Sequence, residues 1–191
     1  MTTAKGVFGW LLQHLERVIE IDPSYTDALN NLGTYYHRAG KYDQSIRYFK
    51  KVTDLDPDFY GGWVNLAGSL LAVGRFQDAL EANLRAYSVR PNECMVISQI
   101  ALNYYYLHDL SEAGKYFKKV LTLDPLSAVS PHLYLAHIAL AEKNQAEAVD
   151  CIKEFLEIHP NAPEAPHLRE TLAALSSQSV FEPGQVVQTK R

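Results

Sequence analysis

Side chains capable of acid–base or metal chemistry are scattered through this sequence. His132 and His137 are five residues apart, whereas two ligands on one helical face need a spacing of three or four. Cys94 and Cys151 belong to no Cys-x-x-Cys pair. The sequence also lacks the phosphate-binding, dinucleotide-binding, nucleophile-elbow and zinc-protease motifs. We therefore expect no enzymatic activity, no metal and no cofactor.

Side chains suited to peptide binding do recur at a fixed spacing. Asn31, Asn65 and Gln99 lie 34 residues apart. A carboxamide both donates and accepts hydrogen bonds, so a ladder of them can bracket the backbone amides of an extended peptide. Tyr105 and Tyr106 add aromatic side chains of the kind that anchor partners. The alternatives are that the amides bond locally and that the tyrosines only cover helix surface.

The ladder belongs to a repeat that runs through most of the chain. Pro23, Pro57, Pro91 and Pro125 are spaced by 34 residues, and Pro160 follows after 35. A fixed period of this size indicates a repeat array. Other positions repeat with the prolines: Leu29/Trp63/Ile97, Leu32/Leu66/Ile100, Gly33/Ala67/Ala101, Tyr36/Leu70/Tyr104, Ser45/Ala79/Ala113, Phe49/Asn83/Phe117 and Val52/Ala86/Val120.

Within each repeat the apolar positions predict two helices. The first four apolar positions of each repeat have i, i+3, i+4, i+7 spacing, which forms one apolar face of a helix. Trp63 belongs to this face and is expected to be largely buried. Proline ends the second helix, because it cannot continue the hydrogen-bond ladder. Gly6, Gly40 and Gly74 are expected to end first helices, with Lys143-Asn144 as the turn of the last repeat.

The pattern resembles the tetratricopeptide repeat over roughly residues 6 to 160, with Asn83 in place of the usual aromatic residue and Ser45 in place of alanine. The resemblance implies an all-α fold, a right-handed superhelix of antiparallel helix pairs with a C-terminal capping helix. The expected divisions are a half repeat at 6–25 holding only a second helix, repeats at 26–59, 60–93, 94–128 and 129–162, a capping helix at 163–176 and a disordered tail at 177–191.

The resemblance also implies a non-enzymatic scaffold that binds an extended peptide or partner segment in a concave groove. The residues expected to line it are Asn30, Asn31, Thr34, His37, Arg38, Asn65, Leu71, Gln99, Leu102, Tyr105, Tyr106, Leu133, Tyr134 and His137. Members that clamp a C-terminal carboxylate carry Lys and Asn where this chain has Asn30 and Thr34, and Lys and Arg where it has Met95 and Gln99. We therefore expect an internal segment with apolar side chains.

The beginning of the chain offers a second candidate surface. The half repeat lacks its first helix, which leaves Phe8, Leu11 and Leu15 without a packing partner, and Trp10 lies beside them. An exposed apolar strip usually marks an interface. We expect this edge to pack against an upstream segment of a longer protein or against a second copy, as a homodimer.

Composition narrows the function classes further. The net charge is −4 and the pI about 6.0, which argues against nucleic acid as a partner. The longest apolar run is too short to span a bilayer, so we expect no membrane insertion and a cytoplasmic location. The alternative interpretations are a regulatory or localisation fragment of a larger protein, secreted or enzymatic, and, less favoured, a glycosyltransferase-type enzyme of the kind that carries such arrays.

Overall fold

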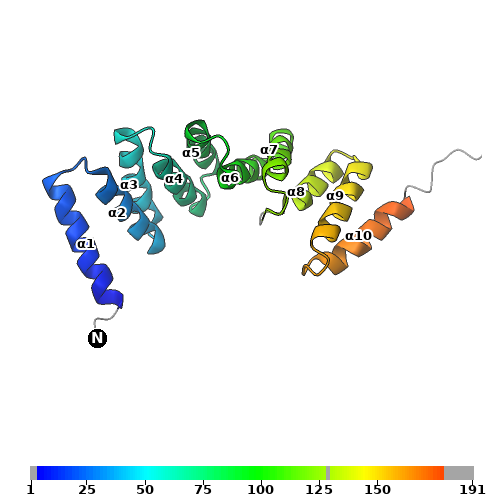
Figure 1. The fold of residues 1–191 in the computed structure, drawn as a ribbon, viewed down its shortest axis with the longest axis horizontal. Helices are drawn as coiled ribbons and strands as arrows, with labels where there is room; N and C mark the ends of the chain where they lie inside the picture. The colour runs from blue at the N-terminus through cyan, green and yellow to red at the C-terminus, as the bar shows by residue number, and fades with distance from the viewer. Residues whose placement is uncertain (1–3, 128–129, 179–191) are drawn as a thin grey trace, which may run out of the picture. The chain divides into compact units, whose positions relative to one another are not determined.

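The computed structural model describes residues 4–127 and 130–178. Every regular element in these ranges is an α-helix (Figure 1), which confirms the expected all-α class. The helices are α1 (Ala4–Ile21), α2 (Thr26–Arg38), α3 (Tyr42–Leu55), α4 (Tyr60–Ala72), α5 (Phe76–Val89), α6 (Cys94–Tyr106), α7 (Leu110–Leu123), α8 (Pro131–Ala141), α9 (Gln145–Ile158) and α10 (Ala165–Gln178).

The helix boundaries follow the 34-residue period. The first helices α2, α4 and α6 have 13 residues each, and the second helices α3, α5 and α7 have 14. Helix α1 is a second helix by register, because its last residue, Ile21, lies 34 positions before Leu55 at the end of α3. The apolar positions and the proline spacing therefore set where each helix ends.

The turns between paired helices use the left-handed backbone region. Gly40 and Gly74 have φ angles of 70° and 73°, as glycine allows at no steric cost. His108 (62°) and Lys143 (60°) adopt the same conformation with a side chain. Of the expected turn pair Lys143-Asn144, Lys143 is the residue with the left-handed backbone, whereas Asn144 accepts a hydrogen bond from the backbone N–H of Glu147 at the start of α9.

The expectation for Gly6 was wrong. Helix α1 begins at Ala4 and is continuous through residue 6, so this glycine does not form the turn that Gly40 and Gly74 form. Glycine is a poor helix former, but packing and neighbouring residues routinely override such a preference.

The chain forms two compact units, residues 1–116 and 117–191. In the first unit, successive helices from α1 to α6 pack against one another. Leu29, Leu32, Phe49 and Val52 are at most 1% exposed between α2 and α3. Gly33 permits this packing, since a Cβ atom there would lie 2.6 Å from the Phe49 ring.

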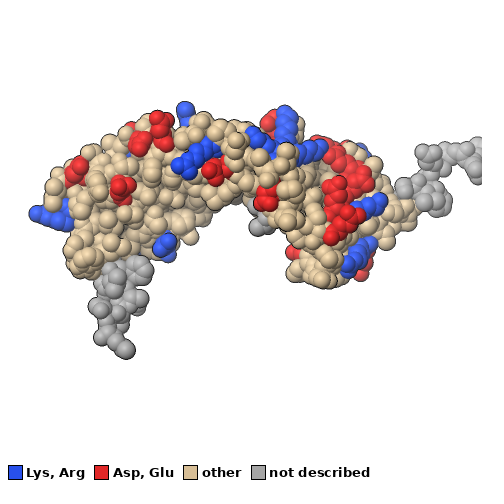
Figure 2. Space-filling model, in the orientation of Figure 1, with Lys and Arg blue, Asp and Glu red and all other residues tan. Residues whose placement is uncertain are grey.

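The second unit contains the end of α7 and helices α8 to α10. Phe117, Leu135, Ile152 and Phe155 form its buried interior. Helix α10 is attached to α9 by a hydrogen bond from the Gln145 side chain to a backbone carbonyl of α10. Its outward residues are short or polar, as expected of a capping helix. Acidic side chains gather over α9 in Figure 2.

Trp63 is partly exposed and packs against two clusters of buried residues, and its indole N–H donates to the carbonyl of Pro57 (2.8 Å). Asn83 and Asn103 are fully buried, and their amide atoms have no hydrogen-bond partner among the described residues. Helix α10 extends two residues into the expected tail, and the remaining tail, 179–191, lies outside the described residues.

Candidate functional site

The candidate site in the first unit is the face formed by α2, α4 and α6, which we call the first-helix face. The side-chain Nδ2 of Asn65 on α4 donates to Oδ1 of Asn30 on α2 (3.1 Å). Asn31 on α2 is exposed, whereas Oε1 of Gln99 on α6 is buried with no partner among the described residues. The ladder residue Asn65 is therefore bonded to Asn30, the neighbour of the ladder residue Asn31, across two successive repeats.

A second polar connection fixes the orientation of His37. Its Nδ1 lies 2.9 Å from Oγ of Ser69, which lies 2.9 Å from Oγ of Ser45. The same two hydroxyls also lie within hydrogen-bond distance of the backbone carbonyls of Asn65 (3.0 Å) and Gly33 (2.8 Å). Ser69 on α4 therefore connects His37 on α2 to Ser45 on α3.

The aromatic end of the same face lies on α6. Tyr106 is 50% exposed, and its ring lies 5.4 Å from that of Phe76 and 5.9 Å from that of Tyr105. Tyr105 is half-buried, and burial raises the pKa of its hydroxyl, so the group stays protonated near neutral pH. Leu71 and Leu102 are half-buried beside the core. This end of the face is apolar with hydroxyl tips.

The remaining groove candidates belong to the second unit and are described there by themselves. The ring of Tyr134 stacks on Phe117, with centroids 4.7 Å apart. Leu133 is half-buried and His137 is exposed, both on α8. Without these three, the groove candidates on helices α2, α4 and α6 of the first unit are Asn30, Asn31, Thr34, His37, Arg38, Asn65, Leu71, Gln99, Leu102, Tyr105 and Tyr106.

The N-terminal edge candidates lie on α1. Trp10 is 58% exposed and Leu11 39% exposed, while Leu15 is half-buried. The backbone of Phe8 lies in α1, but its side chain is outside the described part of the chain. The ring of Trp10 also lies against that of His14, with centroids 3.8 Å apart and an angle of 37° between the ring planes.

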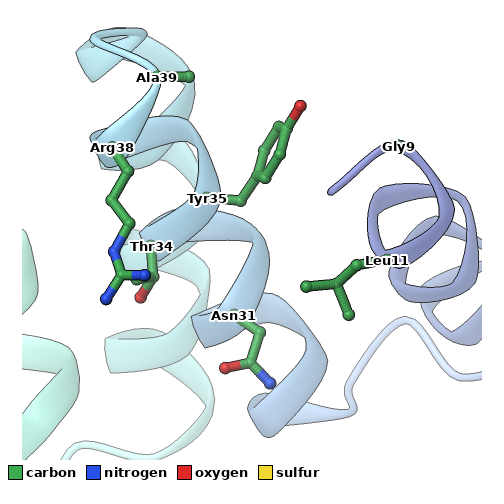
Figure 3. Close-up of a pocket in the computed structure, with 7 residues that line it drawn as sticks. All are labelled: Gly9, Leu11, Asn31, Thr34, Tyr35, Arg38 and Ala39. Atoms are coloured by element: carbon green, nitrogen blue, oxygen red, sulfur yellow. The ribbon is translucent and has the colours of Figure 1, made fainter. Parts of the chain in front are cut away.

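A pocket of about 660 Å³ lies between α1 and α2 (Figure 3). Its lining joins one edge candidate, Leu11, to three groove candidates, and the full lining is Gly9, Leu11, Asn31, Thr34, Tyr35, Arg38 and Ala39. The volume is in the range of ligand pockets. Sequence reasoning missed Tyr35, although its spacing of four from Asn31 places both on one helix face.

Groups with metal or nucleophile chemistry are not assembled in the described ranges. No set of three His, Cys, Asp or Glu side chains there is placed to hold a metal ion. Burial raises the pKa of the Cys151 thiol, which disfavours the reactive thiolate. None of the helices within residues 4–127 and 130–178 is long and apolar enough to cross a bilayer.

Comparison with known sequences places this chain among repeat proteins. Residues 26–59 and 97–125 match family models described as tetratricopeptide repeat. The chain is 25% identical to anaphase-promoting complex subunit CDC16 of Saccharomyces cerevisiae, over 78% of this chain and 22% of that protein. It is 26% identical to the Hsp70-Hsp90 organising protein of Plasmodium falciparum, over 74% of this chain and 55% of that protein.

A third relative is an enzyme. The Drosophila melanogaster protein O-mannosyl-transferase Tmtc3 is 27% identical over 76% of this chain, but the match covers only 16% of that enzyme. The chain thus spans between about a sixth and about half of the length of these three relatives.

Solved structures have the same fold. The crystal structure of YrrB, described as a TPR protein with an unusual peptide-binding site, superposes with a TM-score of 0.78 at 19% identity, over 88% of this chain and 86% of that one. The first TPR of Spaghetti (RPAP3), bound to the HSP90 peptide SRMEEVD, gives a TM-score of 0.57 at 25% identity, over 62% of this chain and 93% of that one. With its 34-residue helix pairs and the two matched repeats, this chain is a tetratricopeptide-repeat protein.

Proposed function

We propose that the chain is a non-enzymatic protein-interaction scaffold that binds an extended partner segment along the first-helix face of its first unit. The observation that carries the proposal is the bond from Asn65 to Asn30. It uses one N–H of the Asn65 amide and leaves the other N–H and the carbonyl oxygen for a peptide backbone. A side chain already held in place loses less entropy on binding.

The chemistry of this face favours an apolar internal segment over an acidic C-terminus. The peptide bound to Spaghetti ends in Glu-Glu-Val-Asp. This chain has Asn30, Thr34, Met95 and Gln99 at the positions where carboxylate-binding members need cationic and amide side chains. Met95 and Tyr106 are 53% and 50% exposed on α6, so an apolar or aromatic side chain would cover them.

The test is selection of binding peptides from a random 12-residue library, followed by titration against matched variants. Two double variants are compared with the unchanged protein, Asn31→Ala/Asn65→Ala and Tyr105→Ala/Tyr106→Ala. Each should weaken the binding free energy of the selected peptide by at least ~1 kcal/mol, the usual threshold for an interface residue that matters. Arg47→Ala/Lys50→Ala, on the exposed side of α3, is the control and should leave affinity unchanged. Affinity that survives both first-helix pairs would place binding elsewhere.

A further inference from the structure

The buried face of α1 is less covered than the same face of every other second helix described. Leu11 occupies the position of Ser45, Ala79, Ala113 and Ala148, all of which are 0% exposed, yet Leu11 is 39% exposed. Leu15 and Val18 are half-buried, whereas their equivalents Phe49 and Val52 are 1% and 0% exposed. In complete repeats a first helix covers these positions.

The chain itself shows what fills the corresponding space one repeat later. Helix α2 lies against both α3 and α4. Its Asn30 accepts a hydrogen bond from Asn65, and Nδ1 of its His37 lies 2.9 Å from Oγ of Ser69. Subtracting 34 converts Asn65 and Ser69 into Asn31 and Tyr35, which line the pocket between α1 and α2 (Figure 3). The pocket is therefore the place of a first helix.

The pocket also has a charge preference. Among the described residues that line the pocket, Arg38 is the charged one, and its side chain forms no ion pair or hydrogen bond within the described part of the chain. Figure 3 shows this side chain running back along α2 toward Thr34. An occupant that runs parallel to α2 brings its C-terminal turn near Arg38. The Arg38 guanidinium can donate to the unpaired carbonyls of that turn and to a carboxylate beside them.

Helix α1 does not form the short turn that joins a second helix to its first helix in the complete repeats. Complete repeats connect first and second helices through a residue with φ between 60° and 73°. At the equivalent position, residue 6, α1 is helical and the turn is not formed. A second copy offers a poor occupant, because α2, α4 and α8 are each packed against their own second helix, and the exposed side of α10 carries Arg169, of the same charge as Arg38.

We propose that the pocket between α1 and α2 docks an amphipathic helix of a partner protein, with a small residue over Leu11 and a carboxylate at its C-terminal end facing Arg38. This goes beyond the proposed binding of an extended segment. Both sites use Asn31, but the tyrosines of α6 belong only to the extended-segment site.

The probe is a synthetic helix that imitates α2. An amidated peptide with the sequence of residues 25–39, labelled with fluorescein at its N-terminus and carrying Arg38→Glu within the peptide, is titrated by fluorescence anisotropy. A matched peptide carries Arg38→Gln. Saturable binding is expected, about two- to fivefold tighter for the Glu peptide, as for a partly exposed ion pair. The Arg38→Gln variant of the protein should remove that difference.

Protein variants locate the site. The Leu11→Asp variant of the protein should bind the Glu peptide with at least tenfold lower affinity. Because this change could also loosen α1, Asn31→Trp provides a second obstruction at an exposed position, and circular dichroism melting checks both. Leu126→Asp, at a leucine 69% exposed outside the pocket, should have no effect, and Tyr105→Ala/Tyr106→Ala should not either.

Three results would overturn the proposal. One is the lack of saturable binding by either peptide. Another is binding of the Glu peptide to the Leu11→Asp and Asn31→Trp variants that is as tight as its binding to the unchanged protein. The third is a concentration-dependent dimer of the chain alone that dissociates on Leu11→Asp, which would assign the pocket to a second copy. Sedimentation as a monomer, together with peptide binding, supports the partner helix.

Discussion

The hydroxyl oxygens of Ser45 on α3 and Ser69 on α4 lie 2.9 Å apart in the interior of the first unit, and both side chains are 0% exposed. Ser45 occupies a position that is alanine in the other three complete repeats, so its hydroxyl is not needed for packing. Ser69 connects it onward to His37. Two adjacent repeats are thus coupled by a polar contact inside an apolar array.

This contact predicts coupled stability effects. Ser45→Ala and Ser69→Ala should each lower the free energy of unfolding by about 1 kcal/mol, the usual contribution of a buried hydrogen bond. The double variant should lose less than the sum, by about 0.5 kcal/mol or more, because both changes remove the same interaction. Urea unfolding measures all three. Strict additivity would mean that the two hydroxyls bond only to their backbone carbonyls.

For Asn83 we predict a substitution that raises the free energy of unfolding rather than lowering it. Its amide is fully buried without a partner among the described residues, and a buried unpaired polar group costs free energy. Asn83→Leu should raise the free energy of unfolding by about 1–3 kcal/mol, the desolvation penalty of such a group. Asn65→Leu is the control, since its amide does donate to Asn30, and it should not stabilise. A destabilised Asn83→Leu in thermal melts would reveal a hidden partner, such as buried water.

His108 tests the backbone argument. Its φ of 62° is a conformation that costs a residue with a side chain about 1–2 kcal/mol. His108→Gly should therefore stabilise the first unit, offset in part by the greater freedom of glycine in the unfolded chain. Gly74→Ala, at the same repeat position with φ 73°, is the mirror experiment and should destabilise. Effects of equal sign in the two variants would contradict the shared turn geometry.

His132 makes the second unit sensitive to acid. Burial lowers the pKa of this imidazole, with His159 acting in the same direction and Glu154 opposing. The unfolded state then binds a proton at a higher pH than the folded state, so stability present above the unfolded pKa of about 6.5 is lost as pH falls below it. His132→Gln should flatten the decline between pH 7 and pH 5 in urea melts. A decline of unchanged slope would assign it to other groups.

The sequence predicted the helices well because each end is set locally, by a proline or a turn at a fixed position. It placed Asn65 and Asn30 on one face but did not show that they bond to each other. Ser69 lies 24 residues from Ser45 and 32 residues from His37 in the sequence. Their contacts depend on how α2, α3 and α4 pack, which the sequence alone did not show. Trp63 was expected to be largely buried, but the sequence did not show that its indole N–H donates to the carbonyl of Pro57.

The sequence predicted the residue types of the candidate site but not the division of its residues between two compact units. The proposed face mixed residues of two units, and the pocket between α1 and α2 arises from a helix that the repeat pattern calls for and α1 does not have. No single residue carries that signal. The reduced burial of Leu11 relative to Ser45 reveals it only when repeats are compared in space.

Helix α10 sets the stoichiometry that this chain can support. Its half-buried leucines face α9, and its outward side presents Pro166, His167, Arg169 and Glu170. Because this outward surface is polar, it offers no apolar face to the α1 end of another molecule, and we expect head-to-tail association into rings or fibres to be disfavoured. Complexes formed through the α1–α2 pocket should accordingly saturate at one helix per chain rather than polymerise.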